Sequence, residues 1–281
     1  MDAPVAPPFL DVECSLGGKR WRLRAGDERL GLAISQRLDV PEIVGRVMAG
    51  RGVTLEQAEQ YLTPQLRHLL PDPSSFRDMD RAVERITAAI RNGEKIAIFG
   101  DYDVDGATSS GLLKRFFNAI GVPSEIYIPD RMKEGYGPNA EAMEILKKRG
   151  ADLVVTVDCG IVSFDALGHA KDIGLDVIVI DHHQAETRLP DAVAIVNPKR
   201  HDESQKFTYL AAVGVVFLLV VALNRSLRQA GWYTDQRREP APRHWLDLVA
   251  LGTVCDVVPL VGLNRAFVAQ GLKVMARRGN P

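Results

Sequence analysis

From Lys95 to Val196 the sequence passes repeatedly from a short apolar run through a loop into a helical pattern. This alternation is typical of βαβ units, in which parallel strands form one sheet and helices cover its faces. We therefore predict an α/β domain built on a parallel β-sheet flanked by helices. Strands are expected at residues 96–99, 124–128, 153–157, 177–180 and 194–196, with helices at residues 109–119, 140–149 and 164–172 and further helical regions at residues 209–228 and 244–251.

The beginning of the chain shows no such alternation. Two short helical patterns, a Pro-rich linker and a third helix are expected at residues 41–49, 54–62, 71–75 and 82–92. Thr54 and Gln57 stand at the spacing of a capping box at the start of the second helix. We predict a small helical N-terminal extension over residues 1–75 and a larger α/β domain over residues 76–281.

Charge and cysteine usage limit the possible functions. The formal net charge is −1, whereas a protein that binds nucleic acid through a broad basic face is usually more positive. Any nucleic-acid site is therefore expected to be a local groove, or to be completed by metal cations or another domain. The three cysteines form no CxxC pair, which favours a reducing cytoplasm over a disulfide framework or a structural zinc site.

Two features bear on membranes. The N-terminus has no basic segment followed by an apolar run, so no signal peptide is expected. Residues 210–223 carry no charge, but 14 residues are too few for a typical membrane span and are typical of a buried core helix. We expect a cytoplasmic protein without a membrane segment.

Acidic residues and histidines directly follow three of the predicted strands. Residues 96–99 run into Asp101, Asp103 and Asp105, residues 153–157 end at Asp158, and residues 177–180 end at Asp181, His182 and His183. The carboxyl ends of parallel strands share one edge of the sheet, and ligands bind in the crevice outside it. Because residues two apart in an extended segment face the same way, the three aspartates after the first strand are expected to point into this crevice together. Asp256, which follows a helical stretch, is a further candidate.

So many carboxylates in one crevice would repel one another unless cations neutralise them. Carboxylate and imidazole ligands without thiolates favour Mn²⁺ or Mg²⁺. Two such ions about 3.5–4 Å apart would polarise a phosphate and lower the pKa of a bound water, which then serves as the nucleophile at neutral pH. The sequence therefore predicts a hydrolytic site with two divalent cations.

Each residue taken alone also has an ordinary structural interpretation. An Asp after a strand often caps a helix, and a single histidine is more often a core or surface residue than a ligand. The Asp-x-Asp-x-Asp-Gly run is similar to the start of an EF-hand loop, but the twelfth position counted from Asp101 is Leu112 rather than Glu. These interpretations do not explain why all the groups share one edge of the sheet.

Four segments show which family the sequence resembles. GDYDVDGATS, VTVDCGI, VIVIDHHQ and LGTVCDVVPL are similar, in this order, to the four motifs of the DHH phosphoesterase superfamily, and Asp181-His182-His183 is the triplet that gives the superfamily its name. Four further segments, FRDMDRAVERI, IPDRMKEGYGPN, AIVNPKR and LAAVGVVF, resemble its RecJ-like exonuclease branch. Cys255 departs from the alanine that the family more often has in the fourth motif.

The resemblance implies a role for each candidate. The implied metal ligands are Asp158, which would bridge both ions, then Asp105, His182 and Asp256 on one ion, and Asp103 with Asp101 on the other. His183 would contact the scissile phosphate and stabilise developing charge. Asp181 would orient an imidazole through a hydrogen bond.

The loop after the second predicted strand offers three more candidates at the same edge of the sheet. They are Arg131, Lys133 and Tyr136. Such residues can hold a phosphate and stack a base, and the alternative is a Gly-rich surface loop in which Asn139 only caps the next helix. Lys199 and Arg200 are equally consistent with phosphate contacts and with an exposed basic pair.

The resemblance implies metal-dependent hydrolysis of phosphodiester bonds in single-stranded DNA from the 5′ end, in DNA repair and recombination. The implied partners are single-stranded DNA, a single-strand-binding protein and a helicase. A second substrate-binding domain of the DHHA1 type and an OB-fold follow the fourth motif in such proteins, and this sequence is expected to lack them. The alternatives are a DHH-family oligoribonuclease or cyclic-dinucleotide phosphodiesterase, and a non-catalytic DHH scaffold.

Overall fold

The computed structural model describes residues 7–22 and 27–280, and the chain divides into two compact units, Met1–Pro64 and Gln65–Pro281. The short elements α4 (Leu66–Leu69) and η2 (Pro73–Ser75) belong to the second unit. The predicted domain boundary between residues 75 and 76 stays a prediction.

The first unit is a small cluster of helices. Its elements are the 3₁₀ turn η1 (Phe9–Asp11) and the helices α1 (Glu28–Leu38), α2 (Glu42–Gly50) and α3 (Ala58–Leu62). Its buried core consists of Ile34, Met48, Val53 and Ala58. α1 and α2 pack so closely that a Cβ atom on Gly45 would lie 2.1 Å from the carbonyl oxygen of Gly31. Thr54 and Gln57 make the two reciprocal bonds of a capping box, at 3.3 and 3.4 Å, just before α3.

The second unit is built on one sheet of five parallel strands. They are β1 (Ile96–Gly100), β2 (Ser124–Tyr127), β3 (Leu153–Val157), β4 (Asp176–Ile180) and β5 (Ala194–Val196). Their order in the sheet is β2-β1-β3-β4-β5, and every neighbouring pair is parallel. The last residues of β3, β4 and β5 are paired in register, Val157 with Ile180 and Ile180 with Val196. The five strands therefore end at the same edge, as the sequence predicts.

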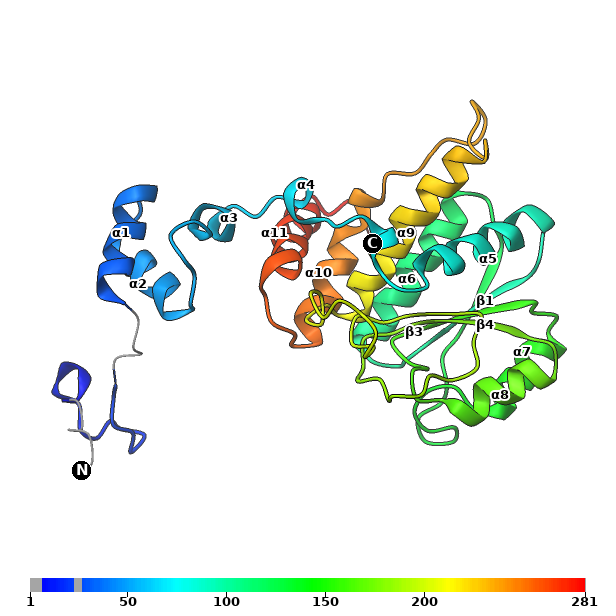
Figure 1. Ribbon diagram of the computed structural model, residues 1–281, viewed down its shortest axis with the longest axis horizontal. Helices are drawn as coiled ribbons and strands as arrows, with labels where there is room; N and C mark the ends of the chain where they lie inside the picture. The colour runs from blue at the N-terminus through cyan, green and yellow to red at the C-terminus, as the bar shows by residue number, and fades with distance from the viewer. Residues whose placement is uncertain (1–6, 23–26, 281) are drawn as a thin grey trace. The chain divides into compact units, whose positions relative to one another are not determined.

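Helices cover both faces of this sheet (Figure 1). One face carries α7 (Ala140–Lys148) and α8 (Phe164–Asp172), and the other carries α5 (Met79–Asn92), α6 (Val104–Ala119) and α9 (Ala212–Gln229). Strand β1 shows the alternation that this requires, because Phe99 packs in the core under α7 and α8 whereas Ile98 packs in the core on the opposite face. This arrangement confirms the predicted α/β fold.

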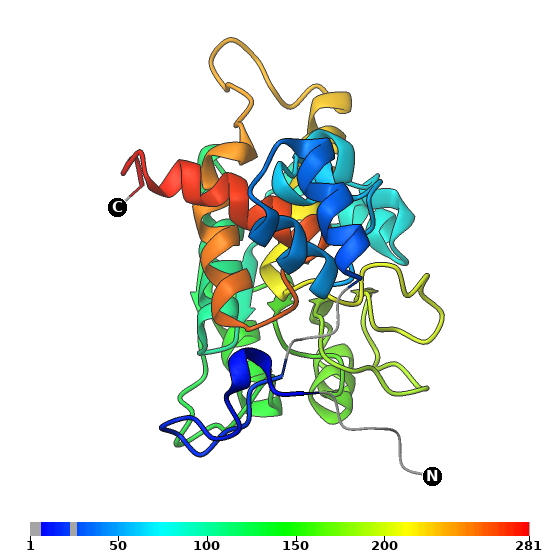
Figure 2. The ribbon, with the colours of Figure 1, turned by 90° about the vertical axis from the view of Figure 1, so that its left-hand side faces the viewer.

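Three further elements complete the helical layer next to α6 and α9. They are η3 (Pro242–Trp245), α10 (Leu246–Cys255) and α11 (Gly262–Met275). α10 packs against α6, α9 and α11, and Figure 2 shows the loop that follows α9 extending away from these helices. Among the described residues, α9 alone is long and apolar enough to cross a membrane by length and composition. Its side chains lie at the centre of the larger core, with Leu219 and Leu223 fully buried, so the predicted core helix is confirmed.

One local prediction about the first motif is wrong. The segment from Asp101 to Asp105 was expected to be extended, but α6 begins at Val104, five residues before the predicted helix start. The side chain of Asp103 accepts a hydrogen bond of 2.8 Å from the Gly106 amide and so acts as the N-cap of α6. Asp105 therefore lies in the first helical turn, and the third aspartate reaches the crevice from a helix rather than from an extended strand.

Candidate metal centre

Three strand ends deliver acidic groups to the carboxyl edge of the sheet. Asp101, Asp158 and Asp181 each follow a strand directly, and their backbone amides continue the ladder to the last carbonyl of the neighbouring strand. The Asp158 amide, for example, donates to the Ile180 carbonyl at 3.0 Å. Asp158 then turns into the left-handed region with φ of 62°, which an Asp tolerates better than most residues. The parallel register thus sets the spacing of the three acids.

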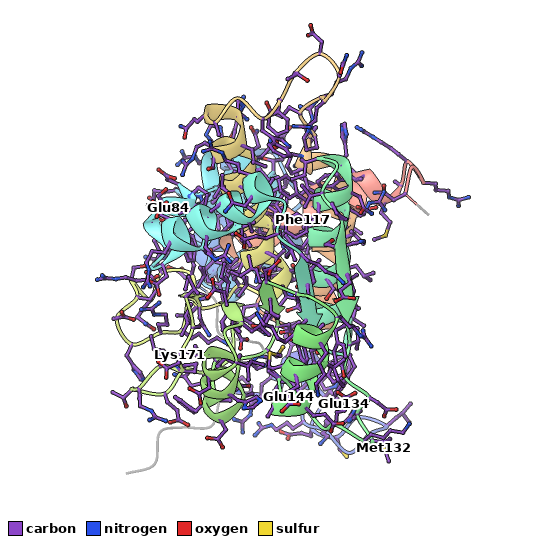
Figure 3. The ribbon with its side chains drawn as sticks, turned by 90° about the vertical axis from the view of Figure 1, so that its right-hand side faces the viewer. Glu84, Phe117, Met132, Glu134, Glu144 and Lys171 are labelled. Atoms are coloured by element: carbon purple, nitrogen blue, oxygen red, sulfur yellow. The ribbon has the colours of Figure 1, made fainter. Side chains whose placement is uncertain are left out.

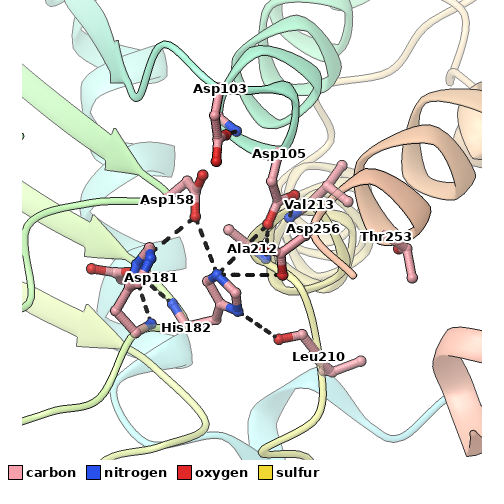
Figure 4. Close-up of polar contacts among 12 residues, drawn as sticks. Asp103, Asp105, Asp158, Asp181, His182, Leu210, Ala212, Val213, Thr253 and Asp256 are labelled. Carbon is pink, nitrogen blue, oxygen red and sulfur yellow. Dashed lines mark hydrogen bonds and ion pairs between the residues drawn. The ribbon is translucent and has the colours of Figure 1, made fainter. Parts of the chain in front are cut away.

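Two helices deliver the other acids. Asp105 is 1% exposed, and its carboxylate accepts hydrogen bonds from the amides of Ala212 and Val213 at 2.6 and 2.9 Å. These amides are free donors because they open α9, so the start of this helix fixes and stabilises the Asp105 carboxylate. Asp256 is the C-cap residue of α10 and lies beside Asp105 in the site (Figure 4).

The side chains form three overlapping groups whose possible ligand atoms lie within 4.8 Å of one another. The groups are Asp101, Asp103 and Asp158; Asp105, His182 and Asp256; and Asp158, His182 and His183. Asp158 joins the first group to the third, and His182 joins the third to the second. The geometry therefore provides two neighbouring positions for a cation, with Asp158 between them.

The imidazole of His182 faces carboxylates with an unprotonated nitrogen. Burial lowers the pKa of His182 to about 4, so the ring is neutral at physiological pH. Nδ1 lies 3.0 Å from the Leu210 carbonyl and carries the proton, because a carbonyl can only accept. Nε2 then presents its lone pair 3.3 Å from Asp158 Oδ1, and 3.7 and 3.8 Å from oxygens of Asp256 and Asp105. Four electron-rich atoms at these distances repel one another, and a cation between them removes the repulsion.

Several buried atoms at this edge have no hydrogen-bond partner among the described residues. They are both carboxylate oxygens of Asp158, Oδ1 of Asp101, Oδ2 of Asp256 and Nε2 of His182. Burial also raises the pKa values of Asp101, Asp105, Asp158 and Asp256 above the ordinary range for Asp. Buried polar atoms are normally paired, and unpaired ones indicate a missing ion or water. The donor set of carboxylate oxygens and an imidazole nitrogen fits Mn²⁺ or Mg²⁺.

Asp181 differs from its neighbours because its oxygens are fully used. Oδ1 accepts from the amides of His182 and His183 and from Nδ1 of His183, at 2.7, 3.1 and 2.8 Å, and Oδ2 accepts from the Ile161 amide at 3.0 Å. Burial alone would raise the pKa of Asp181, but these hydrogen bonds outweigh it and the pKa lies below the ordinary value. The hydrogen bond to Asp181 raises the pKa of His183. Asp181 therefore holds the His183 ring and has no free oxygen for a cation.

The loop between β2 and α7 brings two of its three predicted residues to this edge. The Tyr136 hydroxyl donates to the Asp158 carbonyl at 3.2 Å and lies 3.4 Å from Nδ1 of His183. The Arg131 guanidinium lies 5.0 Å from the centre of the Tyr102 ring, next to the first motif. Lys133 is not brought in, because its side chain is 83% exposed and its ammonium lies 3.8 Å from Asp130.

Glu134 holds this loop in place. Its carboxylate accepts hydrogen bonds from the Tyr127 hydroxyl at 2.6 Å and from the Asp130 amide at 2.8 Å. Glu134 and Met132 are labelled in Figure 3 and show where the loop lies. The hydrogen bond of Asn139 to the Ala142 amide, at 2.8 Å, caps α7. Asn139 therefore caps α7 at the end of the loop, and Tyr136 connects the same loop to the metal centre.

Several groups at the site were not predicted. The Leu210 carbonyl and the α9 amides come from the apolar segment LAAVGVVF, which carries no side-chain signal for function. Asn197 follows β5 directly and donates from Nδ2 to the His183 carbonyl at 2.9 Å. Its position after a strand is the same signal that identified the aspartates. Gly252 lies against Asp105, where a Cβ atom would be 3.0 Å from Oδ1.

The parallel sheet and the carboxylate–imidazole cluster at its carboxyl edge define an α/β domain with a two-cation site. Residues 95–253 match the DHH family, N-terminal domain, and the chain therefore belongs to the DHH family. Among curated proteins it is similar to the single-stranded-DNA-specific exonucleases RecJ of Bacillus subtilis (strain 168) and Salmonella typhimurium (strain LT2). The identities are 38% and 42%, over 92% and 90% of this chain.

Solved structures show the same relationship. A crystal structure of exonuclease RecJ bound to manganese aligns with a TM-score of 0.61 and 36% identity, covering 73% of this chain and 49% of that one. RecJ from Thermus thermophilus in complex with Mn²⁺ aligns with a TM-score of 0.68 and 31% identity, covering 88% of this chain and 33% of that one. The chain spans 31% and 43% of the length of the two curated relatives.

Proposed function

We propose that this chain hydrolyses phosphodiester bonds of single-stranded DNA from the 5′ end with two divalent cations, Mn²⁺ or Mg²⁺. The observation that carries the proposal is Asp158, a 1% exposed carboxylate with two unpaired oxygens between two groups of ligands. No Lys or Arg side chain among the described residues is paired with this carboxylate, so a bound cation would neutralise it. The names of the relatives and their manganese-bound structures support the choice of metal and substrate.

The proposed ligand sets follow from the geometry. One cation would be held by Asp105, His182 and Asp256 and the other by Asp101 and Asp103, and Asp158 would be shared between them. Cations so held supply Lewis acidity and an activated water for attack at phosphorus. The α9 amides keep the Asp105 carboxylate oriented, and the Leu210 carbonyl keeps the His182 lone pair directed at the cluster.

His183 and the loop after β2 are the proposed contacts for the substrate. Asp181 holds Nδ1 of His183, which leaves Nε2 of this half-exposed ring to donate to a phosphate oxygen and stabilise negative charge in the transition state. Arg131 is proposed to bind a phosphate and the half-exposed Tyr136 ring to stack a base. Lys133 is proposed as a peripheral contact, because its exposed ammonium is free to leave Asp130.

Domain roles and partners complete the proposal. Residues 76–281 are proposed as the catalytic domain and residues 1–75 as its extension. The chain is proposed to work in the cytoplasm in DNA repair and recombination, alongside a single-strand-binding protein and a helicase. The low net charge of −1 predicts that few phosphates are contacted by this chain and that its affinity for DNA depends only weakly on salt.

The test is hydrolysis of end-labelled DNA by the metal-free chain as Mn²⁺ or Mg²⁺ is added. Release of mononucleotides from the 5′ end of single strands, with duplexes resistant, is the expected result. Faster turnover of dinucleotides or cyclic dinucleotides than of long strands would instead assign the chain to the alternative phosphodiesterase class. Binding of DNA without hydrolysis at any metal concentration would support a non-catalytic scaffold.

A further inference from the structure

Two adjacent basic residues follow β5, and the structure gives them opposite roles. Arg200 is 5% exposed, and all three nitrogens of its guanidinium form hydrogen bonds within the protein. Nε and Nη2 bind the carboxylate of Asp202 at 2.9 and 2.8 Å, and Nη1 binds Asp78 at 2.8 Å and the Ile195 carbonyl at 2.5 Å. Arg200 therefore anchors the loop after β5 and is not available to a ligand.

Lys199 is held at the metal centre by its backbone. Its amide donates to Oδ1 of Asn197 at 2.7 Å, and Nδ2 of the same Asn197 donates to the His183 carbonyl at 2.9 Å. Asn197 is 1% exposed, so both hydrogen bonds are shielded from water. The side chain of Lys199 is half-buried, and within residues 7–22 and 27–280 its ammonium forms no hydrogen bond or ion pair. Of the pair Lys199 and Arg200, Lys199 is therefore the one whose charged group is left to contact a ligand.

Arg131 and Lys199 lie in the loops after the two outermost strands, and within residues 7–22 and 27–280 neither side chain forms a hydrogen bond or ion pair. The sheet order is β2-β1-β3-β4-β5, and the candidate metal ligands from strand ends follow β1, β3 and β4. Arg131 follows β2 and Lys199 follows β5. A basic residue therefore flanks the metal centre on either side along the edge.

We propose that Lys199 binds a backbone phosphate next to the scissile one, so that the single strand crosses the carboxyl edge from the β2 side to the β5 side. Arg131 then holds the phosphate on the opposite side of the reacting bond. The inference rests on the proposed nuclease function and adds to it the direction of the substrate across the sheet. Asn197 and Arg200 are positioning residues for Lys199, because they fix the loop that carries it.

The experiment combines a protein change with the removal of one phosphate charge. The proteins are the unchanged chain, Lys199→Gln and Lys199→Arg, with Lys171→Gln as a control, because Lys171 lies on α8 and its ammonium is 3.3 Å from Asp191. Three strands are compared: one with a 5′ phosphate, one with a 5′ hydroxyl, and one with a neutral methylphosphonate at the second linkage. Melting temperature and Mn²⁺ binding are measured for each protein.

Lys199→Gln is expected to raise KM about tenfold or more without changing kcat, because a charge-assisted contact is lost outside the reacting bond. It should also lower the slope of log affinity against log salt by about 0.7. The unchanged chain and Lys171→Gln should bind both modified strands more weakly than the strand with a 5′ phosphate. Lys199→Gln should bind one of the two modified strands as well as it binds the strand with a 5′ phosphate, because the phosphate charge removed there is the one that Lys199 contacts. Lys199→Arg should restore most of the affinity.

Three results would overturn the inference in different ways. In the first, the unchanged chain cleaves DNA, and both modified strands weaken binding to Lys199→Gln as much as they weaken binding to the unchanged chain. Lys199 then contacts no adjacent phosphate, and only this inference fails. If the unchanged chain cleaves none of the strands at any metal concentration, the proposed function fails and the inference falls with it. A lowered melting temperature or Mn²⁺ affinity in both Lys199 variants would show a structural role instead.

Discussion

Both edges of the sheet carry acidic residues, but the surroundings of these residues differ. At the amino edge, Arg85 lies 2.6 Å from both Asp176 and Glu94, and the backbone amide of Lys95 binds the carboxylate of Asp152 at 2.9 Å. At the carboxyl edge, the acids of the metal centre face one another and the neutral imidazole of His182, and in the part of the chain that the structure describes no Lys or Arg side chain is paired with them. An acidic cluster becomes a candidate site when its charges are left unpaired, not when acids are merely numerous.

The difference reflects what each edge does in the folded chain. Ion pairs at the amino edge tie strand starts to α5 and need nothing from outside. The carboxyl edge is stable only when its charge is neutralised, which couples metal binding to stability. Removing a charge should therefore have opposite consequences at the two edges.

The largest expected effect comes from changing one residue at each edge. Asp158→Asn should reduce hydrolysis at least about a thousandfold, since the shared ligand is worth several kcal/mol to the transition state. Asp158→Asn should also lower Mn²⁺ occupancy. The fold should survive, because the change removes a buried negative charge that neighbouring carboxylates repel. Arg85→Gln should keep full activity but lose about 1–3 kcal/mol of stability, because Asp176 and Glu94 lose their partner.

Activity assays, metal analysis and urea unfolding of the two variants check this contrast. Near-normal turnover of Asp158→Asn with two bound ions would end the assignment of Asp158 as the shared ligand. Loss of activity in Arg85→Gln without loss of stability would show that the amino edge also takes part in function.

Metal removal should expose the coupling between charge and stability. At Mn²⁺ concentrations of about 100 times Kd, binding adds about 2.7 kcal/mol, or about 5–10 °C in melting temperature for a domain of this size. Burial raises the pKa values of the metal-centre aspartates above their unfolded values, so their contribution to the stability of the metal-free chain is full below the unfolded pKa and is lost as pH rises. The lowered pKa of His182 acts in the opposite direction, but the four aspartates outnumber it, so the net stability should fall with rising pH. Melting curves with and without chelator from pH 5 to pH 8 test this, and a metal-free chain that gains stability with rising pH would contradict it.

The fold and the strand-end residues follow from local patterns. Each predicted strand is present within one residue at either end, because short apolar runs bounded by turns leave few alternatives. Helices α1 and α11 were not predicted, and both contain an interior glycine that weakens a helical pattern. The glycines are needed for packing: a Cβ on Gly271 would lie 2.2 Å from the Leu246 carbonyl oxygen, and Gly31 lies against Arg46.

Contacts between distant segments were beyond reach of the sequence. The hydrogen bonds of Asp105 come from amides 107 and 108 residues away, and Arg200 meets Asp78 across 122 residues. Lys199 and Arg200 are adjacent basic residues that the sequence does not distinguish. Only the contacts of Arg200 with Asp78 and Asp202 in the folded chain show that their roles differ. Likewise the N-cap role of Asp103 depends on where α6 starts, which an extended interpretation of the motif overlooks.

A smaller effect should appear where α10 touches the metal centre. A Cβ on Gly252 would lie 2.3 Å from Thr108 Oγ1, 2.8 Å from Val213 Cγ1 and 3.0 Å from Asp105 Oδ1. Gly252→Ala should therefore cost about 1–3 kcal/mol and weaken Mn²⁺ binding through Asp105. Gly111→Ala in α6 is the control, because its Cβ meets nothing within 4 Å and the change should stabilise the helix by about 0.5–1 kcal/mol. Metal affinity unaltered in Gly252→Ala would show that α10 does not set the position of Asp105.

The smallest expected effects come from the two cysteines beside the proposed ligands. A thiol at either position could in principle act as a nucleophile, and the structure argues against this. Burial raises the pKa of the Cys159 thiol, which remains protonated at neutral pH, and its Sγ lies 3.5 Å from the Val157 carbonyl. A serine hydroxyl can keep that contact, so Cys159→Ser should retain most activity. Cys255 is exposed next to Asp256, and Cys255→Ala should retain activity and remove any inhibition by alkylating reagents, since the adduct rather than the loss of a thiolate would block the crevice. Activity lost in either variant with metal content and melting temperature unchanged would mean that a thiol, and not only the unpaired carboxylates, distinguishes this edge of the sheet.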